Sequence, residues 1–196
     1  HDAGTKYRTA IYPEYKKSKS RTEFDPEERA EQAKMFDMMK RFWASMGCTQ
    51  AKVAGVEADD LLAYFCQTIP GHHDLYTVDA DLLQLQSDYA NVSVLLKCEY
   101  QDNEDGHKGV PYAYTSFSKS MLGDPSDNYG GINGFGPAKW KHLVDEYGYD
   151  GLDELQQCVE TKDYSMLKEA IAETGDKVLQ MLFDNRDEWR KSWDLA

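Results

Sequence analysis

Short apolar segments alternate with helical patterns over residues 49–97, and this order constrains the fold more than any other feature of the chain. The predicted elements are a strand at 49–55, a helix at 57–69, a strand at 74–78, a helical turn after Leu82 and a strand at 91–97. Strands that alternate with helices indicate βαβ units and a parallel sheet. We also expect residues 1–12 to be extended, with a further strand as one option.

The second half of the chain has helical patterns and no strand pattern. These patterns cover residues 111–122, 137–147, 151–159, 163–174 and 176–193. The composition changes near residue 110 without a flexible linker. We therefore predict an α/β domain over residues 1–110 and a helical region over residues 111–196.

A further helix is predicted between Asp25 and Gly47. Asp25 can act as its N-cap, Pro26 suits the first helical position, and Gly47 ends it. Its apolar residues recur at helical spacing and are predicted to belong to the core: Met35, Met39, Phe42, Trp43 and Met46. The preceding segment, PEYKKSKSR at 13–21, is basic and polar and is typical of a solvated loop.

Composition limits the class of protein. No apolar segment approaches the roughly 20 residues that cross a bilayer. The cysteines are scattered without zinc-site spacing, which favours four buried, reduced thiols in a cytoplasmic protein: Cys48, Cys66, Cys98 and Cys158. The formal net charge of −13 by itself opposes nucleic-acid binding, but the acids gather at 57–60, 79–81 and 124–127. Such gathering is typical of a cation site; a plain acidic surface is the alternative.

Two acidic clusters follow predicted strands. Glu57, Asp59 and Asp60 come after the strand at 49–55, and Asp79 and Asp81 come after the strand at 74–78. The carboxyl ends of parallel strands form the ligand-binding edge of such sheets. Carboxylates repel one another unless cations offset them, and these oxygen donors match Mg²⁺ or Mn²⁺, a pair of which is a recurring device for phosphodiester cleavage. The alternative for residues 57–60 is an ordinary acidic helix N-terminus.

The third cluster lies in a glycine-rich segment, LGDPSDNYGGINGFGPAKW at 122–140. Asp124 and Asp127 are three residues apart and precede four glycines and a basic helix start. Glycines let the backbone approach a ligand closely, and a helix N-terminus suits phosphate. An ordinary turn is the alternative for the glycines alone, but their combination with the acids and AKWK indicates phosphate binding.

Four segments resemble the polymerase I-type and phage 5′ nucleases, the flap endonuclease and 5′→3′ exonuclease family. DPSDNYGGINGFGPAKW resembles the family signature SDNIPGVxGIGxKTA, and GVEADDLLAYF (55–65) resembles its GVEADD helix. VDADLLQL (78–85) is similar to DKDLLQL, and residues 2–21 are similar to FDxxxxxFRxxLYPEYKxNR. The resemblance implies a PIN-like, mostly parallel sheet flanked by helices, followed by a helical helix–three-turn–helix DNA-binding region, with an arch around residues 13–46.

The resemblance also implies roles for individual residues. The implied metal ligands are Asp2, Glu57, Asp59, Asp60, Asp79, Asp81, Asp124 and Asp127. Lys16 corresponds to a lysine that reaches the scissile phosphate, and it joins Asp2, Glu57, Asp59, Asp79, Asp81 and Asp127 in the implied catalytic set. The implied DNA-binding residues are Tyr15, Lys16, Lys17, Lys19, Arg21, Gly131, Gly134, Gly136 and Lys139.

The sequence departs from the family pattern in three places. A family chain normally begins with a strand that ends in another essential Asp, and here the sequence starts at His1-Asp2. Three interpretations follow: a fragment, a partner that supplies the strand, or a natural variant of reduced activity. Ala80 stands between the two aspartates where Lys or Gly is usual, and Tyr129-Gly130 replaces Ile-Pro.

The expected function is therefore a 5′→3′ exonuclease and structure-specific 5′-flap endonuclease that hydrolyses DNA by a two-metal mechanism. The expected cofactors are two or more Mg²⁺ or Mn²⁺ ions, with K⁺ at the glycine-rich turn. The expected partners are 5′ flaps, nicked or 5′-ended duplex DNA, RNA of RNA–DNA primers and a DNA polymerase. We expect a monomer in the cytoplasm of a bacterial or phage-infected cell. The alternatives are a nuclease-like protein or fragment that binds DNA without cleaving it, and a PIN-type ribonuclease.

Overall fold

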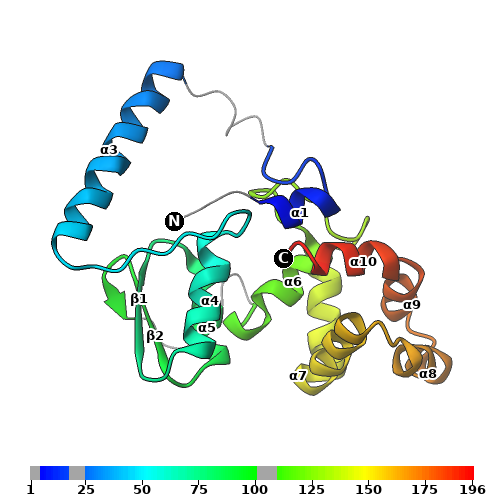
Figure 1. Ribbon diagram of the computed structural model, residues 1–196. Helices are drawn as coiled ribbons and strands as arrows, with labels where there is room; N and C mark the ends of the chain where they lie inside the picture. Colours follow the sequence, from blue (N-terminus) through cyan, green and yellow to red (C-terminus); the bar gives the residue numbers. More distant parts are fainter. Residues whose placement is uncertain (1–4, 18–24, 101–109) are drawn as a thin grey trace. The chain divides into compact units, whose positions relative to one another are not determined.

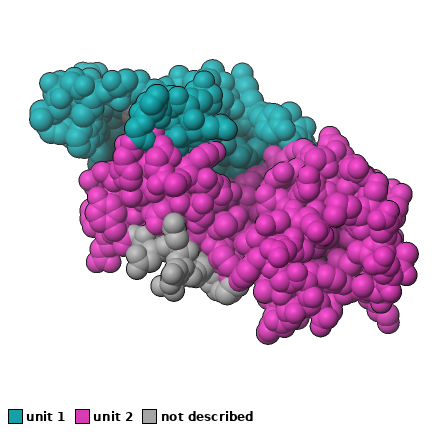
Figure 2. Space-filling view, turned by 90° about the horizontal axis from the view of Figure 1, so that it is seen from below, with its two compact units in different colours: residues 1–71 teal, residues 72–196 magenta. Residues whose placement is uncertain are grey.

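The computed structural model describes residues 5–17, 25–100 and 110–196. By its internal contacts the chain divides into two compact units, residues 1–71 and residues 72–196 (Figure 2). The division predicted at about residue 110 rests on the change from an α/β pattern to a helical one, and it stays a prediction. Each unit is described by itself below.

The first unit contains helices α1 (Lys6–Ile11), α3 (Pro26–Ser45) and α4 (Ala58–Thr68). The predicted extended segment at 1–12 is wrong over α1, where the backbone N–H of Thr9 donates to the carbonyl of Thr5 at 2.8 Å. Residues 1–4 lie outside the described residues. The helix carries Arg8, whose side chain binds the N-cap residue Glu57 and Asp60 at the start of α4. Tertiary contacts therefore stabilise a conformation that the local sequence pattern did not indicate.

Helix α3 begins and ends close to the predicted limits. The Asp25 side chain accepts a hydrogen bond from the backbone N–H of Glu27 at 3.0 Å, and Pro26 occupies the first turn. The predicted burial of its apolar stripe is wrong, because α3 has no buried residue and Phe42 and Trp43 are 55% and 50% exposed. Helical spacing determines which side chains share a face, but not whether another element covers that face.

The predicted strand at 49–55 is also wrong. Residues 49–53 form no regular structure, and Ala54-Gly55 form a turn with Gly55 at a φ of 83°. A strand needs a neighbour to receive its backbone hydrogen bonds, and within the described residues no strand pairs with this segment. The predicted helix at 57–69 is confirmed as α4.

The second unit contains the sheet, in the order β1 (His73–Thr77), β2 (Val92–Leu96) and β3 (Glu99–Tyr100) (Figure 1). β1 and β2 pair in parallel, with Leu75 opposite Val94, as the βαβ pattern predicted. The crossover consists of η1 (Ala80–Leu82) and α5 (Leu83–Asp88). β3 pairs antiparallel with β2 and was not predicted, because two polar residues carry no strand pattern.

Helices complete the second unit. They are η2 (Tyr112–Tyr114), α6 (Thr115–Leu122), α7 (Pro137–Thr161), α8 (Ser165–Thr174), α9 (Lys177–Asp184) and α10 (Arg186–Trp193). The two helices predicted at 137–147 and 151–159 are the two arms of α7, which bends at Gly148, where φ is 64° and ψ is −169°. The single helix predicted at 176–193 is instead two, because the backbone leaves helical geometry at Asn185.

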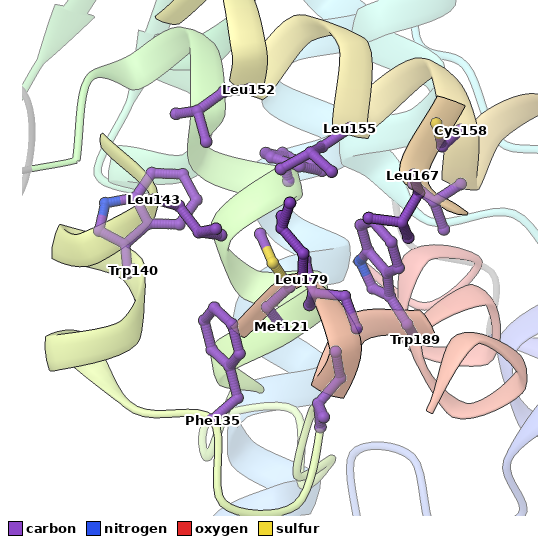
Figure 3. Packing of buried hydrophobic residues seen from close by; sticks show 14 residues of the cluster. Met121, Phe135, Trp140, Leu143, Leu152, Leu155, Cys158, Leu167, Leu179 and Trp189 are labelled. Atoms are coloured by element: carbon purple, nitrogen blue, oxygen red, sulfur yellow. The ribbon is translucent and has the colours of Figure 1, made fainter. Parts of the chain in front are cut away.

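The core of this unit lies among the helices (Figure 3). Trp189 of α10, Met121 of α6 and Leu143 of α7 are all at most 1% exposed. The indole N–H of Trp189 donates to the hydroxyl of Ser120 at 3.0 Å, which satisfies its one buried polar atom. Burying a side chain of this size contributes roughly 1.5–3 kcal/mol. Because side chains of α7 and α10 both pack against α6, the C-terminal end of α6 and the acidic turn after it have a fixed position.

Two expectations from composition have mixed outcomes. All four cysteines are free, as predicted, but only Cys66 and Cys158 are buried, whereas Cys48 and Cys98 are exposed. Within the described ranges, no helix combines the length and the apolar character that a membrane span requires.

Candidate metal and nucleic-acid site

The first group of predicted site residues lies at the N-terminus of α4. Glu57 is the N-cap, and the Asp60 carboxylate accepts a hydrogen bond from the backbone N–H of Glu57 at 3.3 Å, completing a capping box. Glu57 is buried, at 7% exposure, while Asp59 points to the exposed side of the helix. The sequence EADD therefore caps a helix, as one of its two interpretations proposed, and its role as a metal site stays a prediction.

Three side chains from α1 and the following turn bind these carboxylates. Lys16 Nζ lies 2.5 Å from Glu57 Oε1, and Arg8 lies 3.0 Å from Glu57 Oε2. Arg8 also donates from both terminal nitrogens to Asp60, at 2.9 and 3.0 Å. The Tyr15 hydroxyl lies 3.4 Å from Glu57 Oε2. We call Arg8, Tyr15, Lys16, Glu57 and Asp60 the Glu57 cluster.

The charges of the Glu57 cluster stabilise one another. Burial alone would raise the pKa of Asp60, but the hydrogen bonds and the charge of Arg8 outweigh it and hold that pKa below its ordinary value. Burial would likewise lower the pKa of Arg8, and Asp60 more than compensates, so the Arg8 pKa is raised. The Asp60 carboxylate therefore stays ionised, which is the state that binds cations.

The second group follows strand β1 and belongs to the second unit. Asp79 lies two residues after the end of β1, and its carboxylate accepts a hydrogen bond from the backbone N–H of Asp81 at 3.0 Å. This hydrogen bond caps the start of η1. Both aspartates are exposed to solvent. The position agrees with the prediction that acids follow this strand.

Lys119 of α6 joins this group to the acidic turn. Its Nζ lies 2.5 Å from Asp81 Oδ2 and 2.7 Å from Asp124 Oδ2. Asp124 is 9% exposed, and its other oxygen accepts from the backbone N–H and the hydroxyl of Ser126, at 2.8 and 2.5 Å. Burial would raise the pKa of Asp124, but Lys119 and Ser126 outweigh it and lower that pKa. We call Asp79, Asp81, Lys119, Asp124 and Ser126 the Asp124 cluster.

The glycine-rich segment folds into a tight turn. Asp124 and Tyr129 form an isolated antiparallel bridge, and the backbones on either side pack so closely that a Cβ on Gly131 would lie 2.4 Å from the Met121 carbonyl oxygen. Gly134 and Gly136 instead have open space around them. Lys139 Nζ donates to the Gly134 carbonyl at 2.7 Å. Gly131 thus serves packing, whereas Gly134 and Gly136 leave the backbone accessible.

A pocket of about 890 Å³ adjoins the Asp124 cluster within the second unit. Asp79, Asp81, Lys119 and Asp124 line one part of it. The remainder of its wall is largely apolar, and is formed by Val110, Tyr112, Leu122, Pro125, Pro137, Trp140 and Val144. Concave surfaces with apolar walls and a few polar groups are the usual form of ligand sites.

The structure brings some of the predicted site residues together, but not all of them. Asp2, Lys19 and Arg21 lie outside the described residues. Lys17 is exposed and forms an ion pair of 3.5 Å with Glu14. Within the described part of the chain, no three acidic, His or Cys side chains converge in a metal-binding arrangement. The set of metal ligands and the expectation of one common site stay predictions.

Two cations of these clusters were missed in the sequence. Arg8 occurs in the segment YRTAIY, where the matching family motif also has Arg, and that match was the available signal. Lys119 is the sole basic residue between positions 111 and 138, and it lies five residues before Asp124. A lone cation beside an acidic turn is a usable signal for a structural ion pair.

Comparison with known proteins identifies the family. A family model described as "5′-3′ exonuclease, N-terminal resolvase-like domain" matches residues 1–112, more than half of the chain. A 5′-3′ exonuclease of Bacillus subtilis (strain 168) is 32% identical over 155 residues, covering 74% of this chain and 50% of the relative. DNA polymerase I of Mycobacterium tuberculosis (strain H37Rv) is 36% identical over 155 residues, covering 72% of this chain and 16% of the polymerase.

Solved structures share the fold. Zinc-bound T5 5′-exonuclease has a TM-score of 0.69 at 22% identity, covering 97% of this chain and 70% of that one. A complex of the bacteriophage T5 flap endonuclease with DNA and metal ions has a TM-score of 0.67 at 21% identity, covering 97% and 69%. The chain spans about half the length of the curated exonucleases that it matches. With its PIN-like α/β fold and following helical region, the chain belongs to the 5′-3′ exonuclease family.

Proposed function

We propose that this chain acts as a divalent-metal-dependent 5′→3′ exonuclease and 5′-flap endonuclease on DNA. One observation carries the proposal: at two of the acidic motifs that resemble the family, a buried carboxylate is already held by cationic side chains at hydrogen-bond distance. Glu57 is held by Arg8 and Lys16, and Asp124 is held by Lys119. Carboxylates that bind cations at these positions are what a metal-dependent nuclease of this family requires.

The donor chemistry fits Mg²⁺ or Mn²⁺. The candidate ligands Glu57, Asp59, Asp60, Asp79, Asp81, Asp124 and Asp127 offer oxygen atoms only, which hard divalent ions prefer to nitrogen or sulfur. Asp2 belongs to the same proposal by resemblance. When bound, such ions activate a water molecule and stabilise the leaving oxygen of a phosphodiester.

The basic residues of the two clusters have a distinct part in the proposal. Lys16 and Arg8 hold the Glu57 carboxylate in place, and Lys119 does the same for Asp81 and Asp124. Lys16 Nζ also lies 5.3 Å from the centre of the Tyr15 ring, which restricts its position. We propose that the ammonium group of Lys16 turns from Glu57 to a phosphate oxygen when DNA binds, which would offset developing negative charge.

Backbone contacts to DNA are assigned to the glycine-rich turn. Gly134 and Gly136 leave space at the start of α7, where backbone N–H groups suit a phosphate. Lys139, one turn into the helix, adds a positive charge, and Lys17, Lys19 and Arg21 add others near the arch. We also propose that the turn binds a K⁺ ion. Gly131 contributes to DNA binding indirectly, because it allows the shape of the turn.

The comparisons support the class of substrate. One structural neighbour was solved with DNA and metal ions, and several relatives are DNA polymerase I chains. We accordingly propose 5′ flaps and nicked or 5′-ended duplexes as substrates, RNA–DNA primers as further ones, and association with a DNA polymerase. We further propose that the protein acts as a monomer in the cytoplasm of a bacterial or phage-infected cell.

A cleavage assay on 5′-labelled flap DNA tests the proposal, with Mg²⁺, Mn²⁺ and EDTA in parallel. The expected result is release of short 5′ products with either metal and none with EDTA. Asp79→Asn is expected to remove cleavage and to leave DNA binding within a few-fold, because it removes charge and preserves shape. Asp74→Asn is the matched control, because Asp74 is an exposed acid of β1, the strand that precedes Asp79, and is paired with His72 at 3.4 Å.

The outcomes separate the candidate functions. Cleavage that persists in EDTA, or that survives in Asp79→Asn, contradicts the metal mechanism. Salt-dependent DNA binding without cleavage under any metal identifies the chain as a DNA-binding protein of the same ancestry. Faster cleavage of an RNA strand than of the matched DNA flap would instead favour a ribonuclease.

A further inference from the structure

The pocket beside the Asp124 cluster has a composition that this cluster does not explain. The proposed metal binding uses the carboxylates of this cluster, but it does not require the apolar wall of Tyr112, Leu122, Trp140 and Val144. All of these residues belong to the second unit, so the pocket is formed within one compact body. Its volume of about 890 Å³ lies in the range of small-molecule sites, roughly 300–1,000 Å³.

Trp140 supplies an independent sign of a ligand. Its side chain is 4% exposed, packs edge-on against Phe117 at 6.1 Å, and belongs to the pocket wall. Among the described residues, no group accepts a hydrogen bond from its indole N–H. Figure 3 shows the nitrogen on the side of the ring that faces away from the other labelled side chains. An unpaired buried donor destabilises the fold, and an acceptor from a ligand would remove that cost.

The charges around the pocket restrict what that ligand can be. Four acids line it among the described residues, Asp79, Asp81, Asp124 and Asp145, together with two lysines. Lys119 is already paired with Asp81 and Asp124, and Lys141 with Asp145. An anionic group deep in the pocket would therefore be repelled. A purely aliphatic ligand would leave the Trp140 donor and the acidic edge without partners. A neutral, planar group with both a hydrogen-bond acceptor and a donor fits all three features.

We propose that this pocket binds a nucleobase, as a subsite for the base of a terminal nucleotide beside the Asp124 cluster. The base lies against the apolar wall formed by Tyr112, Trp140 and Val144, and one of its acceptor atoms receives the Trp140 indole N–H. An amino group of the base donates to an acid at the polar edge. The inference deepens the proposed nuclease function, and it assigns to this pocket the contact with the base rather than with the phosphate.

The indole nitrogen is buried at present, so the ring edge must turn slightly toward the pocket when the base enters. This requirement makes the Trp140 indole proton the direct reporter. The full chain, labelled with ¹⁵N at tryptophan, is titrated with 2′-deoxyadenosine and 2′-deoxycytidine in EDTA, and 2-deoxyribose serves as the probe without a base. The Trp140 signal is assigned by its absence in Trp140→Phe. Trp189, whose indole is bonded to Ser120, is an internal control.

The expected result is a saturable shift of the Trp140 signal with both nucleosides, with a Kd on the order of a millimolar. No shift is expected with deoxyribose, and the Trp189 signal should stay in place. Val144→Phe, which fills the half-buried wall, is expected to weaken nucleoside binding at least tenfold. Ala172→Phe adds the same ring on the exposed face of α8 and should leave binding unchanged.

Other results overturn the inference. An unshifted Trp140 signal at saturating nucleoside, or an equal shift with deoxyribose, excludes a base site. Equal binding by Val144→Phe, shown by its spectrum to be folded, places the nucleoside elsewhere. Because the titration needs neither metal nor cleavage, a chain that shifts but does not cleave refutes the nuclease alone. A chain that cleaves but does not shift refutes the base subsite alone.

Discussion

The ammonium group of Lys119 lies 2.5 Å from the carboxylate of Asp81, although 38 positions separate the two residues in sequence. The same ammonium group lies 2.7 Å from Asp124, so one cation connects the end of strand β1 with the acidic turn after α6. Burial alone would lower the pKa of Lys119, but Asp124 and Asp81 outweigh it and raise that pKa. Lys119 therefore stays charged wherever the fold is stable.

Lys119→Ala should lower stability most when divalent metal is absent. Removing the cation leaves Asp81 and the largely buried Asp124 close together without compensation, which costs about 1–2 kcal/mol for a partly exposed pair. Thermal melts in EDTA and in Mg²⁺ measure this, and metal should raise the Tm more in Lys119→Ala than in the unchanged chain. Lys141→Ala is the control, because its ion pair with Asp145 is exposed. A metal response equal to that of the unchanged chain would contradict the role of Lys119.

Gly131→Ala should destabilise the acidic turn by about 2 kcal/mol or more, because its φ of 62° disfavours a side chain and the new Cβ would meet backbone at 2.4 Å. Gly130→Ala should change stability by less than about 0.5 kcal/mol, since no atom lies within 4 Å of its Cβ position. Urea unfolding of both variants measures the difference. Similar losses at the two positions would show that the turn adopts another conformation in solution.

Asp176 should contribute to stability above about pH 3.8 and lose that contribution as the pH falls. Burial would raise the pKa of Asp176, but hydrogen bonds from His142, Tyr147 and the start of α9 outweigh it and lower the pKa to about 2. A carboxyl group with a lowered pKa in the folded state stabilises it while ionised, so the contribution declines between about pH 3.8 and pH 2.

Urea unfolding at several pH values tests the role of Asp176. Asp176→Ala should lose about 2 kcal/mol near neutral pH, from one helix cap and two side-chain hydrogen bonds, and the difference from the unchanged chain should shrink toward pH 2. Asp150→Asn, at an exposed position of α7, is the control. A difference that stays constant from pH 5 to pH 2 would contradict the assignment.

Helix α3 should exchange its backbone hydrogens much faster than α6 and the first arm of α7. It buries no side chain, so only local hydrogen bonds oppose its opening, whereas α6 and α7 are held by the core around Met121 and Leu143. Hydrogen–deuterium exchange followed by mass spectrometry measures this. Protection of residues 26–45 at the level of α7 would mean that the stripe containing Phe42 and Trp43 is covered in solution.

Local chemistry allowed much of the fold to be predicted. The cap at Asp25 with Pro26, the β-branched run at 91–97 and the helical patterns after residue 110 depend on neighbouring residues, so they could be read without tertiary information. The predictions that were wrong concern segments whose structure or burial depends on contact with another part of the chain. Residues 49–55 form no strand because no strand pairs with them among the described residues, and α3 forms without the cover that its stripe suggested.

The candidate site divides in the same way. The sequence by itself determined the family motifs and the acids that they contain. It also placed one group of acids after β1 and another at the start of α4, because these are properties of short segments. Only the tertiary structure decided which cation holds which acid. Arg8 and Asp60, like Lys119 and Asp81, are tens of residues apart, and their pairing depends on how helices pack. Charge acts through space at a few ångströms, and sequence spacing does not specify that distance once the chain has turned.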